Sequence, residues 1–168
     1  VYVVRSDTGG VDGPAGQPNV LLHNNGDATF TDVSATMLPN KSDNSQDAQL
    51  VDLDGDGGLD IVVANSVLGV SAADSGDVLI NQGGLQGGVQ GKFLDNSTSF
   101  LEASNFSDGI RLSVIGDDLD ADGDADVIVT VHDLFAGADQ MLFLNQGGAQ
   151  GGTEGAFVPA AGPVFGSA

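Results

Sequence analysis

Asp52-Leu53-Asp54-Gly55-Asp56-Gly57-Gly58-Leu59-Asp60 recurs later in the chain as Asp118-Leu119-Asp120-Ala121-Asp122-Gly123-Asp124-Ala125-Asp126. Both segments read Asp-x-Asp-x-Asp-Gly-x-x-Asp, so carboxylates stand at loop positions 1, 3, 5 and 9. Together with the backbone carbonyl at position 7, they can supply the roughly six to eight hard oxygen ligands that Ca²⁺ takes. The glycine at position 6 permits the sharp turn that wraps such a loop around an ion. Each segment is therefore predicted to bind one Ca²⁺; the alternative is an Asp- and Gly-rich turn without metal.

The flanking residues distinguish these loops from an EF-hand, which needs a bidentate Glu at position 12 and a helix on either side. Position 12 is Val63 in the first loop and Val129 in the second. The residues that follow, 61–64 and 127–131, are β-branched runs that favour strands. Short apolar runs also precede both loops. The predicted unit is strand, calcium loop, strand.

The composition indicates an exported, folded protein. The 168 residues include 24 Asp and Glu but only 4 Lys and Arg, which gives a net charge of −20. Such a charge repels phosphates, so we expect neither nucleic acid nor an anionic membrane as a partner. The hydrophobic content of 40% is too high for a disordered chain. No apolar stretch reaches the roughly 20 residues of a membrane span, and no cysteine is present. We expect an extracellular or cell-surface location, where calcium is abundant.

A longer repeat surrounds the two loops. After each loop come a strand, a variable stretch and an apolar strand ending in Asn-Gln-Gly-Gly, at 78–84 and 142–148, with a shorter copy at 20–30. The Asn-Gly and Gly-Gly tips are typical of hairpins. When Tyr2 is aligned with Ile61, residue 1 lies just after the position where a further calcium loop would have ended. This position indicates a processed or excised chain. The sequence thus predicts eleven strands in a single repeat domain over 1–168. This domain comprises a partial unit that lacks its first strand, at 1–38, and two complete units, at 47–100 and 110–160.

Repeated four-stranded antiparallel units are typical of β-propeller blades. The chain resembles the FG-GAP/VCBS repeat family, which includes the integrin α-subunit propeller, and its phrases at 24–33 and 52–65 are similar to the secreted bacterial branch. The resemblance implies an all-β fold of about two and three-quarter propeller blades; an open β-solenoid or a sandwich of the same hairpins is the alternative. The glycine insertions at 83–91 and 147–155 are longer than usual for the family. The metal ligands that it implies are Asp52, Asp54, Asp56, the carbonyl of Gly58 and Asp60, and then Asp118, Asp120, Asp122, the carbonyl of Asp124 and Asp126.

The resemblance also implies that the calcium loops lie on the face opposite the ligand-binding loops. Binding residues are then expected in the segments that vary between the copies, because loops on a rigid scaffold carry much of protein function. These segments are 7–18, 39–47, 66–77, 96–108 and 133–139.

Candidates for catalysis are few, and we expect no enzyme activity. His23 and His132 have no partner that the sequence identifies, and Glu102 and Glu154 are too isolated for a glycosidase pair. No nucleophile elbow, P-loop or zinc spacing occurs. The phenylalanines are predicted to fill the core between blades rather than a ligand platform; they include Phe30, Phe93, Phe100, Phe106 and Phe157.

Three functional hypotheses follow. The first is an extracellular adhesion or recognition module, with structural calcium and a protein or polysaccharide partner. The second is a structural subunit that assembles with copies of itself into an oligomer or filament, because an unpaired strand edge invites another chain. The third is an accessory domain of a larger secreted enzyme that acts on polysaccharides.

Overall fold

The chain is described from a computed structural model, which places residues 1–5, 16–65, 76–84, 87–97, 110–133, 137–147, 151–152 and 155–160. These residues form eleven strands in three antiparallel sheets. The prediction of an all-β fold with antiparallel sheets is confirmed, whereas ring closure into a propeller and the division into repeat units stay predictions.

The first sheet has three strands, in the order β1 (Tyr2–Val3), β2 (Val20–Asn24) and β3 (Phe30–Asp32). The one-turn helix α1 (Ser34–Met37) leads from it to the next sheet. The sequence did not predict α1, because four residues are too few to show a helical period.

The other two sheets have four strands each. The middle sheet comprises β4 (Ser45–Val51), β5 (Asp60–Asn65), β6 (Gly76–Asn81) and β7 (Phe93–Asp95). The last sheet comprises β8 (Ile110–Asp117), β9 (Asp126–Asp133), β10 (Gly137–Asn145) and β11 (Phe157–Pro159). In both sheets the strands follow one another in chain order, joined by the acidic loop, a variable stretch and the glycine hairpin.

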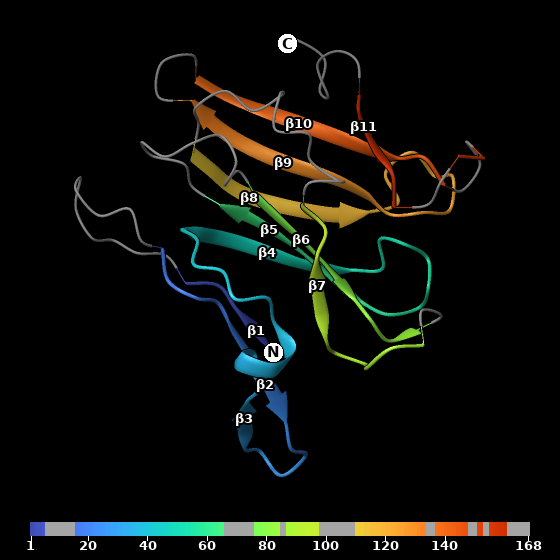
Figure 1. The fold of residues 1–168 in the computed structure, drawn as a ribbon. Coiled ribbons are helices and arrows are strands. Elements are labelled where there is room, and N and C mark those ends of the chain that lie inside the picture. Colours follow the sequence, from blue (N-terminus) through green and yellow to red (C-terminus); the bar gives the residue numbers. More distant parts are fainter. Residues whose placement is uncertain are drawn as a thin grey trace.

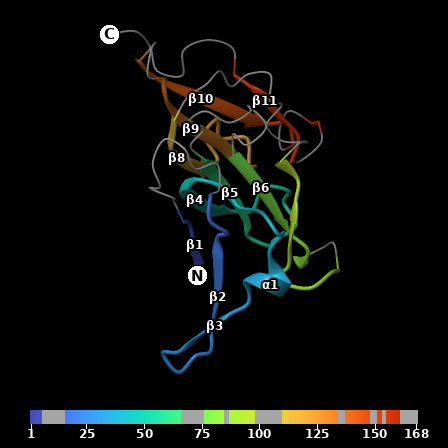
Figure 2. The same cartoon turned by 60° about the vertical axis from the view of Figure 1, so that its left-hand side comes forward.

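The three sheets lie face to face in chain order, with β1–β3 at one end and β8–β11 at the other (Figure 1, Figure 2). Val62 and Val78 of the middle sheet pack with Val127 and Phe143 of the last sheet in one core cluster. On the opposite face, Ile61, Val63, Leu79 and Phe93 form a second cluster with residues of the first sheet. The middle sheet is thus covered on both sides, which explains why β5 and β6 read as continuous apolar runs rather than alternating ones.

Polar contacts also join the middle and last sheets. The Asp47 carboxylate in β4 accepts hydrogen bonds from Ser113 Oγ at 2.6 Å and from the Val114 backbone N–H at 3.1 Å in β8. Nearby, Gly116 lies so close to Val51 that an added Cβ would come within 2.7 Å of its Cγ1. A side chain at residue 116 would therefore push these two sheets apart.

The strand register corrects the alignment of the first sheet. Leu21 pairs with Tyr2, and the corresponding Val78 pairs with Val62, so Tyr2 matches Val62 rather than Ile61. A slip of one residue moves every side chain of a strand to the other face. Tyr2 accordingly packs toward the middle sheet, as Val62 packs toward the last one.

The predicted aromatic core holds in part. Phe93 is buried between the first two sheets, and Phe157 is half-buried against the core between the last two. Phe30 is 49% exposed, so its prediction as a core residue is wrong. Phe93 and Phe157 each pack against the sheet that precedes their own. Among the described residues, no sheet precedes β1–β3, so Phe30 has no such sheet to pack against. Phe100 and Phe106 lie outside those residues.

Candidate metal centres

Each acidic loop connects two neighbouring strands at one end of a sheet, β4 to β5 and β8 to β9. Both loops have left-handed backbone at position 6, with φ of 86° at Gly57 and 105° at Gly123. This is the sharp turn that the sequence predicts. Position 4 is left-handed as well, at Gly55 in the first loop and at Ala121, with φ of 63°, in the second. Two independent loops therefore fold in the same way.

The carboxylates of positions 1, 3 and 9 converge in both loops. One oxygen from each of Asp52, Asp54 and Asp60 lies within 4.8 Å of the others. In the second loop, Asp118, Asp120 and Asp126 form the same group within the same limit. These two sets, here called the first and second acidic clusters, could each hold a metal ion.

The aspartate at position 9 also fixes the loop to the sheet. Asp60 is fully buried; its Oδ2 accepts from the Leu53 N–H at 2.9 Å and its Oδ1 from the Asn81 N–H at 2.8 Å. Asp126 is equally buried and accepts from Leu119 at 3.0 Å and from Asn145 at 2.9 Å. Position 9 thus joins the start of each loop to the third strand of its sheet.

The carboxylate of the aspartate at position 5 lies outside the acidic cluster in both loops. Asp56 Oδ1 accepts from the Gly58 N–H at 2.7 Å, and Asp122 Oδ1 accepts from the Asp124 N–H at 3.2 Å. Neither joins its acidic cluster. The hairpin backbone at Gly84 passes so close to Asp56 that a side chain there would overlap its carboxylate. The structure thus brings together three of the four predicted carboxylates in each loop, and the coordinating role of the fourth, like that of the Gly58 and Asp124 carbonyls, stays a prediction.

Buried oxygens without a hydrogen bond provide a test of whether a cation fits. Asp52 Oδ1 in the first cluster is buried and has no hydrogen-bond partner, and the same holds for Asp56 Oδ2 and Asp122 Oδ2. Leaving a buried carboxylate oxygen unpaired is unfavourable, and an ion is one of the established explanations for it. The donor sets contain oxygen alone, as a hard cation requires. The donor sets of both loops therefore fit a hard cation.

The charges within the clusters oppose one another. Burial raises the pKa of the Asp60 carboxyl to about 6, and the charges of Asp54 and Asp52 act in the same direction. In the second loop, local desolvation and the charges of Asp126 and Asp122 raise the pKa of Asp120. A divalent cation would relieve this repulsion.

Two asparagines that sequence reasoning treated only as turn residues organise both loops. Asn81 Nδ2 donates to the Leu59 carbonyl at 3.1 Å, and its Oδ1 accepts from the N–H groups of Gly83 and Gly91. Asn145 makes the equivalent bonds to Ala125, Gly147 and Gly155. The signal was present in the sequence, since an Asn ends the third strand of every unit.

Residues 1–63 match the family model of the FG-GAP-like repeat. The resemblance inferred from the sequence is thereby confirmed, over a segment that includes the first acidic loop. Among the curated proteins, none matches the chain. Within the described ranges, no helix has the length and apolarity that crossing a bilayer requires.

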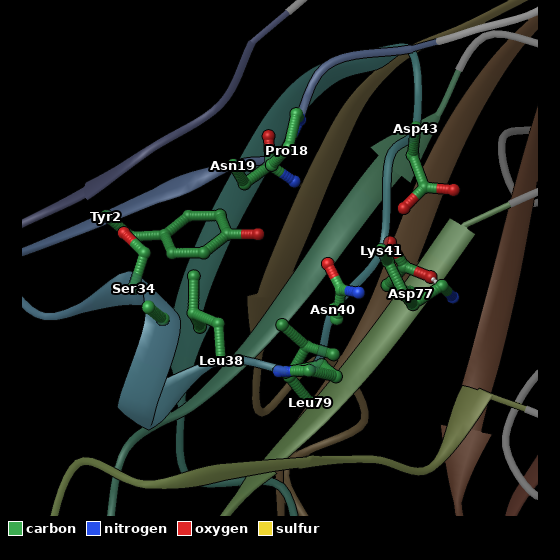
Figure 3. A pocket seen from close by; sticks show the side chains of 12 residues that line it. Tyr2, Pro18, Asn19, Ser34, Leu38, Asn40, Lys41, Asp43, Asp77 and Leu79 are labelled. Atoms are coloured by element: carbon green, nitrogen blue, oxygen red, sulfur yellow. Dashed lines mark hydrogen bonds and ion pairs between the residues drawn. The ribbon is translucent and has the colours of Figure 1, made fainter.

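A pocket of about 500 Å³ lies between the first and middle sheets, toward the end of β6 that is farther from the acidic loop. Figure 3 shows Tyr2, Ser34 and Leu38 on one side and Lys41, Asp43 and Asp77 on the other. Three of the predicted binding segments contribute to it, with Pro18 from 7–18, Asn40, Lys41 and Asp43 from 39–47, and Asp77 from 66–77.

One ion-pair network fixes the polar side of this pocket. Lys41 Nζ contacts the buried Asp77 carboxylate and lies 3.2 Å from Asp95 Oδ2. Although burial opposes the charged form, the hydrogen bond and the charge of Asp77 raise the pKa of Lys41. Lys41 therefore stays charged and ties the linker after α1 to β6 and β7.

In the described part of the chain, the two candidate histidines lie in different sheets. His23 lies exposed in β2 opposite Thr31, and His132 lies in β9 opposite Ala138. Glu102 and Glu154 fall outside the described residues.

Proposed function

We propose that the chain is a calcium-binding extracellular module of β-propeller type, in which Ca²⁺ is structural and the loops at the opposite end recognise a protein or polysaccharide. The observation that carries the proposal is the convergence of three carboxylates in each of two loops. An isolated acidic turn would not repeat this arrangement together with the same buried position 9 and the same left-handed turn.

Calcium is the ion that this donor set suits best. The loop offers carboxylates and backbone carbonyls, without cysteine or histidine, which disfavours zinc and copper. Mg²⁺ demands near-ideal octahedral geometry and keeps several waters, whereas Ca²⁺ accepts flexible coordination by many protein oxygens. Millimolar calcium outside the cell can saturate sites with dissociation constants of about 10⁻⁴–10⁻³ M.

A structural rather than catalytic role follows from where the ligands point. Position 9 is buried and already accepts backbone hydrogen bonds, so an ion at the cluster would clamp the loop to two strands. Binding to the native state alone stabilises it by about 2.7 kcal/mol when the ion is at 100 times its dissociation constant.

Recognition is assigned to the end of the sheets where the pocket lies. Its lining combines apolar side chains with carboxylates, amides, two hydroxyls and a lysine, which suits a polar ligand with apolar faces, such as a peptide or a sugar chain. The strongly acidic composition supports the extracellular assignment, because the calcium and salt of that medium screen the carboxylates.

Thermal unfolding in EDTA and in millimolar Ca²⁺ tests the calcium assignment. We expect Ca²⁺ to raise the melting temperature, and Asp54→Asn and Asp120→Asn each to lose part of that rise. Asp27→Asn, which removes an exposed carboxylate outside both loops, is the matched control and should keep all of it. A melting temperature that is the same in EDTA and in Ca²⁺ would contradict the proposal.

A further inference from the structure

The two outermost sheet faces of the molecule expose apolar side chains. On the outer face of the first sheet, Val1 is 64% exposed, Val3 38% and Phe30 49%. On the outer face of the last sheet, Ile115 is 49% exposed and Leu119 39%, and Ile128, Leu142 and Leu144 are half-buried. Contiguous exposed apolar surface marks an interaction site more often than a scattered apolar residue does.

The interface between the middle and last sheets shows which kind of surface each of these outer faces could contact. The strand pairs define equivalent positions: Asn24–Phe30, Asn81–Phe93 and Asn145–Phe157 pair in the same way in the three sheets. Val1 exchanges backbone hydrogen bonds with Leu22, as Ile61 pairs with Leu79 and Val127 with Phe143.

By this register, the outer face of the first sheet corresponds to the surface that the last sheet buries against the middle one. Val1 matches Val127, Leu22 matches Phe143 and Phe30 matches Phe157. All three partners in the last sheet belong to the core between the sheets.

The outer face of the last sheet corresponds in turn to the surface that the middle sheet buries there. Leu119 matches Leu53, Ile128 matches Val62, and Leu142 and Leu144 match Val78 and Ile80, which are core residues. Each outer face therefore has apolar residues at the positions that are apolar in the internal interface. One outer face corresponds to one side of that interface, and the other outer face corresponds to its other side.

We propose that the outer face of the last sheet in one copy docks on the outer face of the first sheet in a second copy, continuing the stack head to tail. The faces lie at opposite ends of the described sheets (Figure 1), so a contact between them joins one copy to another. Such a contact is heterologous and generates either a closed ring or an open filament. This inference goes beyond the proposed calcium and recognition roles.

Charge sets the conditions for the contact. Two copies with a net charge of −20 repel each other, and two bound Ca²⁺ ions would reduce that charge to −16. Leu119 belongs to the second acidic loop, so calcium at that loop would also order part of the docking face. Association should therefore be stronger in millimolar Ca²⁺ than in EDTA, and should strengthen as added salt screens the remaining charge.

Sedimentation velocity of the whole chain over a range of concentrations in Ca²⁺ tests the proposal. We expect the average mass to rise above the 16.8 kDa of one chain. Phe30→Asp and Ile115→Asp should each remain monomeric, since each places a charge on one of the two faces. Leu94→Asp is the control, because Leu94 is 51% exposed on β7, away from both outer faces, and it should associate as the wild type does.

Mixing the two charged variants separates a heterologous contact from a symmetric one. Phe30→Asp keeps the last-sheet face and Ile115→Asp keeps the first-sheet face, so an equimolar mixture should form dimers and nothing larger. A wild-type chain that stays monomeric at every concentration, or a mixture that stays monomeric, would overturn the proposal. Calcium binding measured on the same samples keeps this outcome separate from a failure of the proposed calcium role.

Discussion

The side-chain amide of Asn145 donates a hydrogen bond to the backbone carbonyl of Leu53 over 3.0 Å, and another to the carbonyl of Ala125 over 3.1 Å. Leu53 belongs to the first acidic loop and Ala125 to the second. One buried side chain therefore holds both loops and joins the middle sheet to the last one. The equivalent Asn81 donates within its own sheet, to Leu59.

This difference predicts unequal losses for two matched substitutions. Asn145→Ala leaves two carbonyls and two glycine N–H groups without their partner, and should lower the free energy of unfolding by about 2–3 kcal/mol. Asn81→Ala should lower it by about 1 kcal/mol less, because no bond to a neighbouring sheet is lost. Urea unfolding of both variants measures the difference, and equal losses would contradict the bridging role of Asn145.

The close approach of Gly116 to Val51 predicts a destabilising overlap. Gly116→Ala should lower the free energy of unfolding by about 1–3 kcal/mol, since the added methyl group forces the packed sheets to shift. Adding Val51→Ala removes the atoms in conflict, so the double variant should be more stable than the sum of the single losses predicts. Strict additivity in a double-mutant cycle would show that the two residues do not meet.

The left-handed backbone at position 4 predicts opposite effects in the two loops. Ala121→Gly should stabilise the chain by roughly 0.5–1 kcal/mol, because it relieves the positive φ of a residue with a Cβ. Gly55→Ala should destabilise it by a similar amount for the same reason. Melting temperatures at fixed Ca²⁺ check both, and a loss of stability in Ala121→Gly would argue against this loop conformation.

The raised pKa of Asp60 predicts how the stability of the metal-free protein depends on pH. Its folded pKa of about 6 lies above the ordinary value of 3.8, so the folded state binds more protons between these two values. The stabilisation from this group is complete below about pH 3.8 and is lost as the pH rises through 6. In EDTA, the chain should therefore be more stable at pH 5 than at pH 7.5, by on the order of 1 kcal/mol.

Asp60→Asn, which mimics the protonated carboxyl, provides the control for the pH effect. The variant should lose most of the difference between pH 5 and pH 7.5 while the remaining carboxylates titrate as before. An unchanged pH profile in Asp60→Asn would assign the effect to other groups.

Much of the fold could be predicted because its signals are local. The acidic loops, the β-branched runs after them and the Asn-Gly and Gly-Gly hairpins each determine their own conformation within a few residues. These signals located the strands and four candidate carboxylates in each loop, of which three converge. Tertiary context was needed for the rest.

The predictions that differ from the structure concern residues whose positions depend on neighbouring strands and sheets. The two-residue strand β1 carries too little pattern to fix its register, so the sequence pattern aligns Tyr2 with Ile61 instead of Val62. Phe30 occupies the same position as Phe93, but its burial depends on a preceding sheet. Asp56 is the fifth residue of its loop, yet the backbone N–H of Gly58 and the nearby Gly84 hairpin determine where its carboxylate lies.

The most direct test of the calcium assignment is the number of ions that the chain binds. Equilibrium dialysis of EDTA-treated protein against ⁴⁵Ca²⁺ should give two ions per chain, and one ion in Asp54→Asn or in Asp120→Asn. Binding of no calcium at millimolar concentrations, or two ions retained in both variants, would contradict the assignment of the acidic clusters as calcium sites.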